Sequence, residues 1–213
     1  MKKYTVVKIK EETLKIDGTG TNSIWEKAKV LDDFCSPWDP DTIKKIEFKA
    51  LWDSENLYFN FKVYDNKVHL ITKDNSNDSI DNSDRVELFF RSNHKMTPYY
   101  CLEIDPKPRL MDFKALPGKV FDFDWNWPSE DIKVKSLIRE TDFCVEGTIS
   151  LKSLTKYNLL KHGIIETGVY RAKYNQISRN HYEPIWITWV NPKTETPNFH
   201  TPSSFGEFIL EGY

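Results

Sequence analysis

Apolar and polar residues alternate with a period of two along most of the chain, as they do in strands that bury one face. In residues 46–52 and 57–63 apolar side chains occupy every second position, and the polar stretch 53–56 separates the two runs. Two alternating runs joined by a short polar turn predict a β-hairpin. The same alternation predicts strands within residues 86–90, 100–104, 143–151, 169–177, 185–190 and 205–210.

Helical periodicity is confined to residues 150–160, where serines precede an apolar run, and this favours one short helix. Residues 74–84 are rich in Asn, Asp and Ser, which is typical of a loop. We therefore predict an all-β fold, an antiparallel two-sheet β-sandwich with helix below roughly 15%, against a base rate of about a third. No linker divides the chain, so residues 1–213 are expected to form a single domain.

The charge balance narrows the classes of partner. The 30 Lys and Arg residues nearly match the 32 Asp and Glu residues, for a formal net charge of −2. We expect no nucleic-acid partner, because general affinity for nucleic acid depends on a basic excess. We also expect no membrane partner, because no segment approaches the roughly 20 apolar residues of a membrane helix. The aromatic content of 14% is high enough to suggest that some aromatic side chains form a binding surface.

The N-terminus lacks the pattern of a secretory signal. Lys8 interrupts the apolar run after the first two lysines, whereas a signal peptide needs an unbroken apolar region. We expect a cytoplasmic protein if the chain is complete, and a secreted or periplasmic one if a leader is missing. Cys35, Cys101 and Cys144 are widely spaced and odd in number, so we expect free thiols and no disulfide.

The common catalytic motifs are missing from the sequence. There is no Gly-rich phosphate loop, no GxSxG and no HExxH, and the five histidines are not paired at helical spacing. No catalytic residue is assigned on these grounds. Two acidic residues that meet only in the folded protein would serve a glycoside hydrolase, so that class of enzyme stays open as an alternative.

Six short motifs, in order along the chain, resemble the carbohydrate-binding modules of family 9. Ile16-Asp17-Gly18 followed by Ile24-Trp25 is similar to the family's opening "IDG…W". The hairpin "ALWDSENLYFNFKVYD", the strand "SDRVELFF" and the segments "YYCLEIDP" and "FCVEGTISLKSL" are similar to the elements that follow, and "NFHTPSSFGEFIL" to the closing "H.P..FG". The resemblance implies a β-sandwich of the group that also holds the DOMON-type domains.

The resemblance implies non-catalytic binding of a sugar or a plant-polysaccharide fragment. In such modules a sugar lies between two Trp rings while Glu, Arg and Asn side chains bind its hydroxyl groups. Glu87 falls on the Glu of the family's "D.VE" motif, so it is the first candidate for a polar contact. The Trp that precedes this motif in some members is missing here. The implied partners are a mono- or oligosaccharide and a polysaccharide-degrading enzyme, such as a xylanase.

Alternation extends the candidate site from Glu87 to neighbouring strands. If Val86, Leu88 and Phe90 face the core, the side chains between them face outward. In residues 169–177 alternation allows either of two faces to point outward, the one with Arg171, Lys173 and Asn175 or the one with Tyr170, Ala172, Tyr174 and Gln176. We take the first, polar set as part of this outward face and predict that the face forms the sugar site. Its polar members are Arg85, Glu87, Glu103 and Asn175, and the Trp that stacks on the sugar is Trp125, Trp127 or Trp186.

Two further possibilities remain at this point. A haem-binding DOMON-type domain would need axial ligands, for which Met96 or Met111 with His94 are the candidates. Apart from that alternative we expect no cofactor except a structural Ca²⁺, with Asp74, Asp78 and Asp81 as oxygen ligands. The spacing of these aspartates does not fit an EF-hand loop.

Overall fold

The computed structural model describes residues 1–10, 14–39 and 43–213. Its strands are β1 (Lys3–Lys8), β2 (Ile46–Trp52), β3 (Asn56–Val63), β4 (Arg85–Arg91), β5 (Tyr99–Ile104), β6 (Leu110–Leu116), β7 (Val120–Asp122), β8 (Ile132–Ile138), β9 (Phe143–Ser150), β10 (Leu160–Lys161), β11 (Ile164–Ser178), β12 (His181–Thr188) and β13 (Gly206–Leu210). Its helices are α1 (Asn77–Asp81), α2 (Leu151–Lys156) and the 3-10 turns η1 (Ser23–Lys27) and η2 (Pro202–Ser204). Among the described residues strand makes up 44% and helix 9%, so the mostly β prediction is confirmed.

The strands form one curled sheet with the order β7-β6-β5-β4-β11-β13-β1-β2-β3-β9-β8, and β10 and β12 each pair with β11 outside this order. β1 runs parallel to both of its neighbours, β13 and β2, whereas the remaining pairs are antiparallel. The prediction of a purely antiparallel pair of sheets was therefore wrong in this respect. β1 joins the first and last parts of the chain, and alternation within a strand carries no information about the direction of its neighbours.

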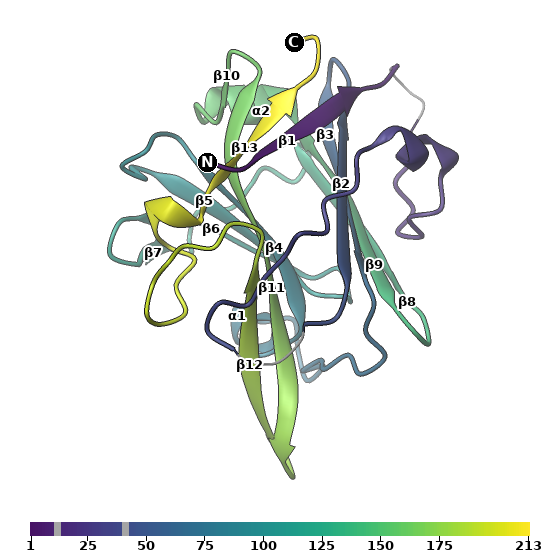
Figure 1. Cartoon of the computed structure of the whole chain (residues 1–213), viewed down its shortest axis with the longest axis vertical. Coiled ribbons are helices and arrows are strands. Elements are labelled where there is room, and N and C mark those ends of the chain that lie inside the picture. Colours follow the sequence, from purple (N-terminus) through teal and green to yellow (C-terminus); the bar gives the residue numbers. More distant parts are fainter. Residues whose placement is uncertain (11–13, 40–42) are drawn as a thin grey trace.

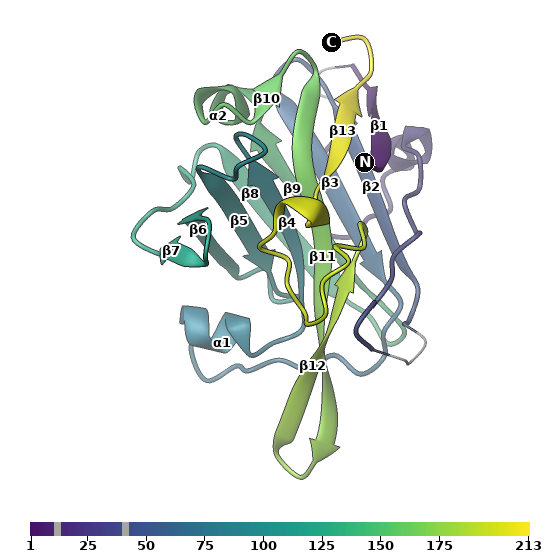
Figure 2. The same cartoon turned by 60° about the vertical axis from the view of Figure 1, so that its left-hand side comes forward.

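The two halves of the curled sheet pack face to face across one hydrophobic core (Figures 1 and 2). Val86, Leu88 and Phe90 of β4 point into this core, as alternation predicts, and meet Phe59 and Phe61 of β3. These side chains are fully buried, and removing water from apolar surface of this extent is the main stabilising contribution to the fold. The β11–β12 hairpin projects beyond the sandwich at one end (Figure 2).

The opposite face of β4 is also covered. Phe89 lies in a second apolar cluster with Tyr170 of β11, Met111 and Phe113 of β6, and Phe199 from the segment before η2. The outward set of β4 is therefore buried rather than exposed on a solvated face, which corrects the prediction from alternation. Alternation fixes the side of a strand on which a residue lies, but it does not show what covers that side.

The register of β11 corrects a second prediction. Tyr170, and not Arg171, lies opposite Glu87, so Arg171 shares a face with Val86. Arg171 and Lys173 contact two buried carboxylates, with 2.5 Å from Arg171 Nη2 to Asp65 Oδ2 and 2.8 Å from Lys173 Nζ to Asp84 Oδ2. Polar side chains are stable on the inner face here because oppositely charged partners meet them. We call Asp65, Asp84, Arg171 and Lys173 the inner cluster.

Serine side chains cap the N-termini of the two short α-helices. Ser150 precedes α2 as expected, and its Oγ accepts a hydrogen bond from Ser153 N at 3.0 Å. Residues 74–84 were predicted as a loop without helix, yet they contain α1. Ser76 caps this helix, with its Oγ accepting from Ser79 N at 3.2 Å. Five residues are too few to show helical periodicity in a sequence.

Candidate functional site

A pocket of about 320 Å³ opens on the outer face of β4, β5 and β6, beneath α1. This volume lies within the range of small-molecule sites, roughly 300–1,000 Å³. The wall combines acidic, basic and aromatic side chains, contributed by α1, β4, β5, β6, β12 and the segments around residues 121–123 and 199–200. The residues that line it are Asn77, Asp78, Asp81, Arg85, Glu87, Glu103, Met111, Phe113, Phe121, Phe123, Trp186, Phe199 and His200.

The strand registers bring the polar floor of the pocket together. Glu87 lies directly opposite Glu103 of β5 on one side and Tyr170 of β11 on the other. Arg85 is two residues earlier on β4 and therefore shares the face of Glu87. Trp186 of β12 lies opposite Ala172, which itself pairs with Arg85. Four residues predicted from the sequence thus meet in one pocket.

Arg85 is the centre of the polar floor. Its Nε donates a hydrogen bond to Glu103 Oε2 at 2.6 Å and lies 3.0 Å from Glu87 Oε1. Its Nη2 lies 3.0 Å from Asp81 Oδ1, and the Trp186 ring centroid is 5.5 Å from the guanidinium carbon. Because Nε carries one hydrogen, directed at Glu103, Glu87 Oε1 has an ionic contact but no hydrogen-bond partner. We call Arg85, Glu87 and Glu103 the pocket cluster.

The pocket cluster has an excess of negative charge. The side chains of Arg85, Glu87 and Glu103 are 3%, 1% and 6% exposed. Burial, followed by the neighbouring charge of Glu103, raises the pKa of Glu87 well above its ordinary value, even though Arg85 opposes the shift. Burial also raises the pKa of Glu103 against the opposing effect of Arg85. One guanidinium does not compensate two carboxylates out of water.

Aromatic side chains form the opposite wall. Trp186 meets Phe199 edge-on, with 5.6 Å between ring centroids. Phe199 in turn stacks on Tyr170, with centroids 4.2 Å apart and an angle of 12° between the rings. Phe123 is 46% exposed at the rim. An apolar wall beside a polar floor suits a ligand with one apolar and one polar face.

The closing segment supplies two pocket residues, Phe199 and His200, that sequence analysis did not select. Tyr99 Oη and His200 Nδ1 are 3.0 Å apart. Burial lowers the pKa of His200 to about 3, so the imidazole is neutral near pH 7. Both residues lie within "NFHTPSSFGEFIL", and that motif, used for the resemblance alone, was the available signal.

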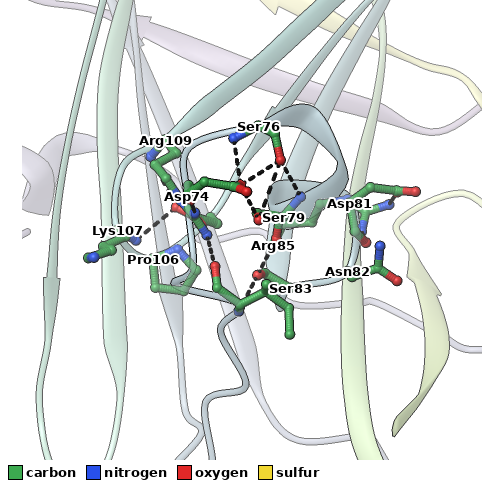
Figure 3. Close-up of polar contacts among 12 residues, drawn as sticks. Asp74, Ser76, Ser79, Asp81, Asn82, Ser83, Arg85, Pro106, Lys107 and Arg109 are labelled. Carbon is green, nitrogen blue, oxygen red and sulfur yellow. Dashed lines mark hydrogen bonds and ion pairs between the residues drawn. The ribbon is translucent and has the colours of Figure 1, made fainter. Parts of the chain in front are cut away.

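The loop before α1 is held in place by polar contacts among its own residues and with Arg109 (Figure 3). The Asp74 carboxylate accepts hydrogen bonds from Ser76 Oγ at 2.6 Å and Ser79 Oγ at 2.5 Å. Arg109 binds the Asp74 carbonyl oxygen and ties the loop to the end of β5 through Asp105. This local order places α1 as one wall of the pocket.

The three aspartates considered for calcium turn to different partners. Asp74 accepts hydrogen bonds from the loop serines, Asp78 Oδ2 lies 3.1 Å from Lys73 Nζ, and Asp81 contacts Arg85. Within residues 1–10, 14–39 and 43–213, no group of three or more His, Cys, Asp or Glu side chains is arranged to hold a metal. The structure does not bring these carboxylates together, and calcium binding stays a prediction.

The other predicted sugar contacts lie outside the pocket. Trp127 is buried in the main core and donates from Nε1 to Ser153 Oγ at 2.9 Å, and Trp125 packs against Tyr100 with 4.8 Å between centroids. Asn175 lines a different cavity, of about 410 Å³, beside Arg171. Trp125 and Trp127 were chosen because they resembled loop aromatics, but residues 125–127 fold back onto the core. Asn175 was chosen because the face of β11 that carries it was taken as the outer one.

The candidate haem ligands do not meet in one cavity. Met96 is 1% exposed in the second apolar cluster, and His94 is exposed at the surface. Met111 lines the pocket, but neither His94 nor Met96 does. Cys35, Cys101 and Cys144 are free thiols. The part of the chain that is described has no helix of the length and apolarity needed to cross a membrane.

Comparison with known proteins identifies a matching family and several structures of similar fold. A family model described as "Carbohydrate family 9 binding domain-like" matches residues 16–213. A Bacteroides uniformis structure, described as a candidate carbohydrate-binding protein, has a TM-score of 0.71 and 18% identity, covering 99% of each chain. No reviewed protein sequence matches the chain significantly.

Two further structures are family 9 carbohydrate-binding modules from Caldicellulosiruptor kristjanssonii. The complex with cellotriose has a TM-score of 0.68 and 19% identity, covering 100% of this chain and 95% of that one. The complex with glucose has a TM-score of 0.65 and 19% identity, covering 100% and 97%. At these identities the likeness to solved structures establishes the fold.

Proposed function

Because the chain belongs to the carbohydrate family 9 binding domain-like family, we propose that it binds carbohydrate, without catalysis, in the pocket between α1 and β4–β6. The ligand is a mono- or oligosaccharide, of the kind released from plant polysaccharides. One observation carries the proposal: Trp186 and the buried pocket cluster line the same cavity. Family 9 modules of similar fold have been solved with glucose and cellotriose.

The chemistry of the two walls supports a sugar. A pyranose ring presents C–H groups on its faces, and these pack on the flat ring of Trp186 and its aromatic neighbours. Its hydroxyl groups both donate and accept, so they match a carboxylate beside a guanidinium. Glu87 Oε1, which has no hydrogen-bond partner in the protein, gives the floor an unused acceptor. In this proposal Glu87, Arg85 and Glu103 orient the hydroxyls and Trp186 supports the ring.

The geometry gives less support to a glycoside hydrolase. Such enzymes place two carboxyl groups about 5–10 Å apart on either side of the scissile bond. Glu87 and Glu103 instead lie within 3.0 Å and 2.6 Å of the same Arg85 Nε, on one side of the cavity. The protein is therefore proposed to assist an enzyme that degrades polysaccharide rather than to act as one.

Calorimetric titration with glucose, xylose, cellobiose and xylo-oligosaccharides tests the proposal. Trp186→Ala should weaken binding about tenfold, because it removes the stacking surface. Trp125→Ala is the matched control, since Trp125 packs against Tyr100 away from the pocket, and it should bind like the wild type. Equal loss in both variants would move the site elsewhere.

Two outcomes would overturn the proposal itself. One is a lack of binding to any sugar on a broad glycan array by the folded wild type. The other is turnover of aryl glycosides or xylo-oligosaccharides that Glu87→Gln abolishes, which would make the protein an enzyme.

A further inference from the structure

Resting on this proposed function, we infer that the pocket prefers a sugar that carries a positive charge, an amino sugar with a free ammonium group, over a neutral sugar. The preference follows from the charge of the floor, from an unpaired carboxylate oxygen and from the make-up of the aromatic wall. A neutral sugar would satisfy the hydroxyl-binding groups but would leave the charge of the floor uncompensated.

The first observation is a charge count. The pocket cluster combines two carboxylates with one guanidinium, all nearly inaccessible to water. Asp81 and Asp78 add carboxylates at the rim, where their side chains are 58% and 71% exposed and where Lys73 Nζ, 3.1 Å from Asp78 Oδ2, adds one positive charge. Arg85 is the one Lys or Arg among the residues that line the pocket. Carboxyl groups therefore outnumber cations around the pocket, and a positively charged ligand would favour their ionised forms, most strongly between low-dielectric walls.

The hydrogen bonding of Glu87 supports the inference independently of the charge count. Glu87 is 1% exposed and lines the pocket, yet its Oε1 has no hydrogen-bond partner. A buried carboxylate oxygen left in this state raises the free energy of the empty protein. A ligand ammonium, which donates up to three hydrogen bonds and carries the missing charge, would remove that penalty.

The aromatic wall of the pocket is suited to a cation. Trp186 already lies over a cation, with its ring centroid 5.5 Å from the Arg85 guanidinium carbon. Phe113 and Phe121 add further ring faces to the same cavity, 5.0 Å apart between centroids. Aromatic faces attract ammonium groups, most strongly out of water. His200 does not oppose this attraction, because its lowered pKa, about 3, keeps it neutral.

The experiment compares glucosamine, glucose and N-acetylglucosamine by calorimetry at about pH 7, where most of an ordinary free amine is protonated. N-acetylglucosamine is the neutral control that keeps a nitrogen at the same carbon. We expect glucosamine to bind about tenfold or more tightly than either neutral sugar. Glu87→Gln should remove most of this preference, and Asp81→Asn, a change at an exposed rim residue that contacts Arg85, should reduce it in a variant that keeps Glu87 and Glu103.

Glu183→Gln is the matched control. It removes one negative charge from an exposed carboxylate paired with His181, outside the pocket, and should keep the preference unchanged. Neutral sugars that bind as tightly as glucosamine, or more tightly, would overturn the inference and leave the proposed function standing. A wild type that binds none of the three sugars, nor any other glycan, would overturn both.

Discussion

Two buried groups of charged residues lie on opposite faces of β4 and β11, and they differ in how completely their charges are balanced. The inner cluster sets Asp65 and Asp84 against Arg171 and Lys173, two charges of each sign, with Lys44 close to Asp65. The pocket cluster sets two carboxylates against Arg85 alone. The carboxylates of the inner cluster each have a positively charged partner within the protein, whereas the two carboxylates of the pocket cluster share one.

The carboxylate oxygens show the same difference in their hydrogen bonds, although Arg171 Nε of the inner cluster also has no hydrogen-bond partner. Both oxygens of Asp84 accept, Oδ1 from Tyr174 N at 2.7 Å and Oδ2 from Lys173 Nζ at 2.8 Å. Both oxygens of Asp65 accept as well, including Oδ1 from Lys44 Nζ at 2.8 Å. Glu87 Oε1 has no hydrogen-bond partner, only the ionic contact of 3.0 Å with Arg85 Nε. A buried carboxylate whose oxygens are all hydrogen-bonded holds strands together, whereas one left incomplete inside a pocket is available to a ligand.

The largest expected effect is on the inner cluster. Asp84→Asn removes one carboxylate charge and leaves Lys173 beside a neutral amide, so it should lower the free energy of unfolding by about 3–5 kcal/mol. Urea denaturation measures this change. Asp78→Asn is the control, because its partner Lys73 is exposed and such surface pairs contribute about 0–1 kcal/mol. Similar losses in the two variants would show that burial does not distinguish the inner cluster.

Glu87→Gln should change stability far less, and in the opposite direction. It leaves one carboxylate for one guanidinium and removes the repulsion from Glu103, so the free energy of unfolding should stay within about 1 kcal/mol of the wild type or rise. The same denaturation experiment measures it. A loss as large as that of Asp84→Asn would mean that both clusters are structural, and the contrast between them would be lost.

Alternation predicted most of the strands but not the way in which they assemble. The hairpin of β2 and β3, and the faces of β4 and β5, follow the sequence pattern closely. β1 was not predicted because its few residues carry little alternation, and its parallel pairing depends on β13 at the far end of the chain. Strand partners so distant in sequence leave no signal in either segment alone.

For the candidate site, the resemblance pointed to Glu87 and alternation added Arg85 and Glu103, and the structure places all three in one pocket. The same reasoning misplaced Asn175, because alternation allowed either face of β11 to point outward and the more polar face was taken as the outer one. Charged residues such as Arg171 can lie inside when Asp65 and Asp84 come from other segments to meet them. Alternation has no access to such long-range pairing.

The two clusters should also respond to pH in opposite directions. Although burial alone raises the pKa of Asp65, the Lys44 hydrogen bond and the nearby charges of Arg171 and Lys173 together hold that pKa well below its usual range. Its stabilising contribution is present above about pH 3.9, the unfolded value, and is lost as pH falls. Glu87 has a raised pKa, so its ionisation destabilises the fold as pH rises above about 4.3.

Thermal unfolding of the wild type and Glu87→Gln across acid and neutral pH tests this pair of trends. Both proteins should lose stability together on acidification, because both keep Asp65. The difference in Tm in favour of Glu87→Gln should widen as pH rises from about 4 to about 7, since only the wild type must ionise Glu87. A constant difference over that range would contradict the assigned direction for Glu87.

The smallest effect is expected from calcium, which is the other possible source of the missing positive charge. A divalent cation at the pocket cluster or in the loop would stabilise the folded state alone and raise Tm. The structure favours no change, because Asp74 is occupied by Ser76 and Ser79 while Asp81 contacts Arg85. Tm of the wild type in EDTA and in excess calcium should therefore coincide. A rise that Asp74→Asn abolishes would restore the loop site, whereas a rise abolished by Glu87→Gln would mean that a metal ion, and not a ligand amine, completes the pocket cluster.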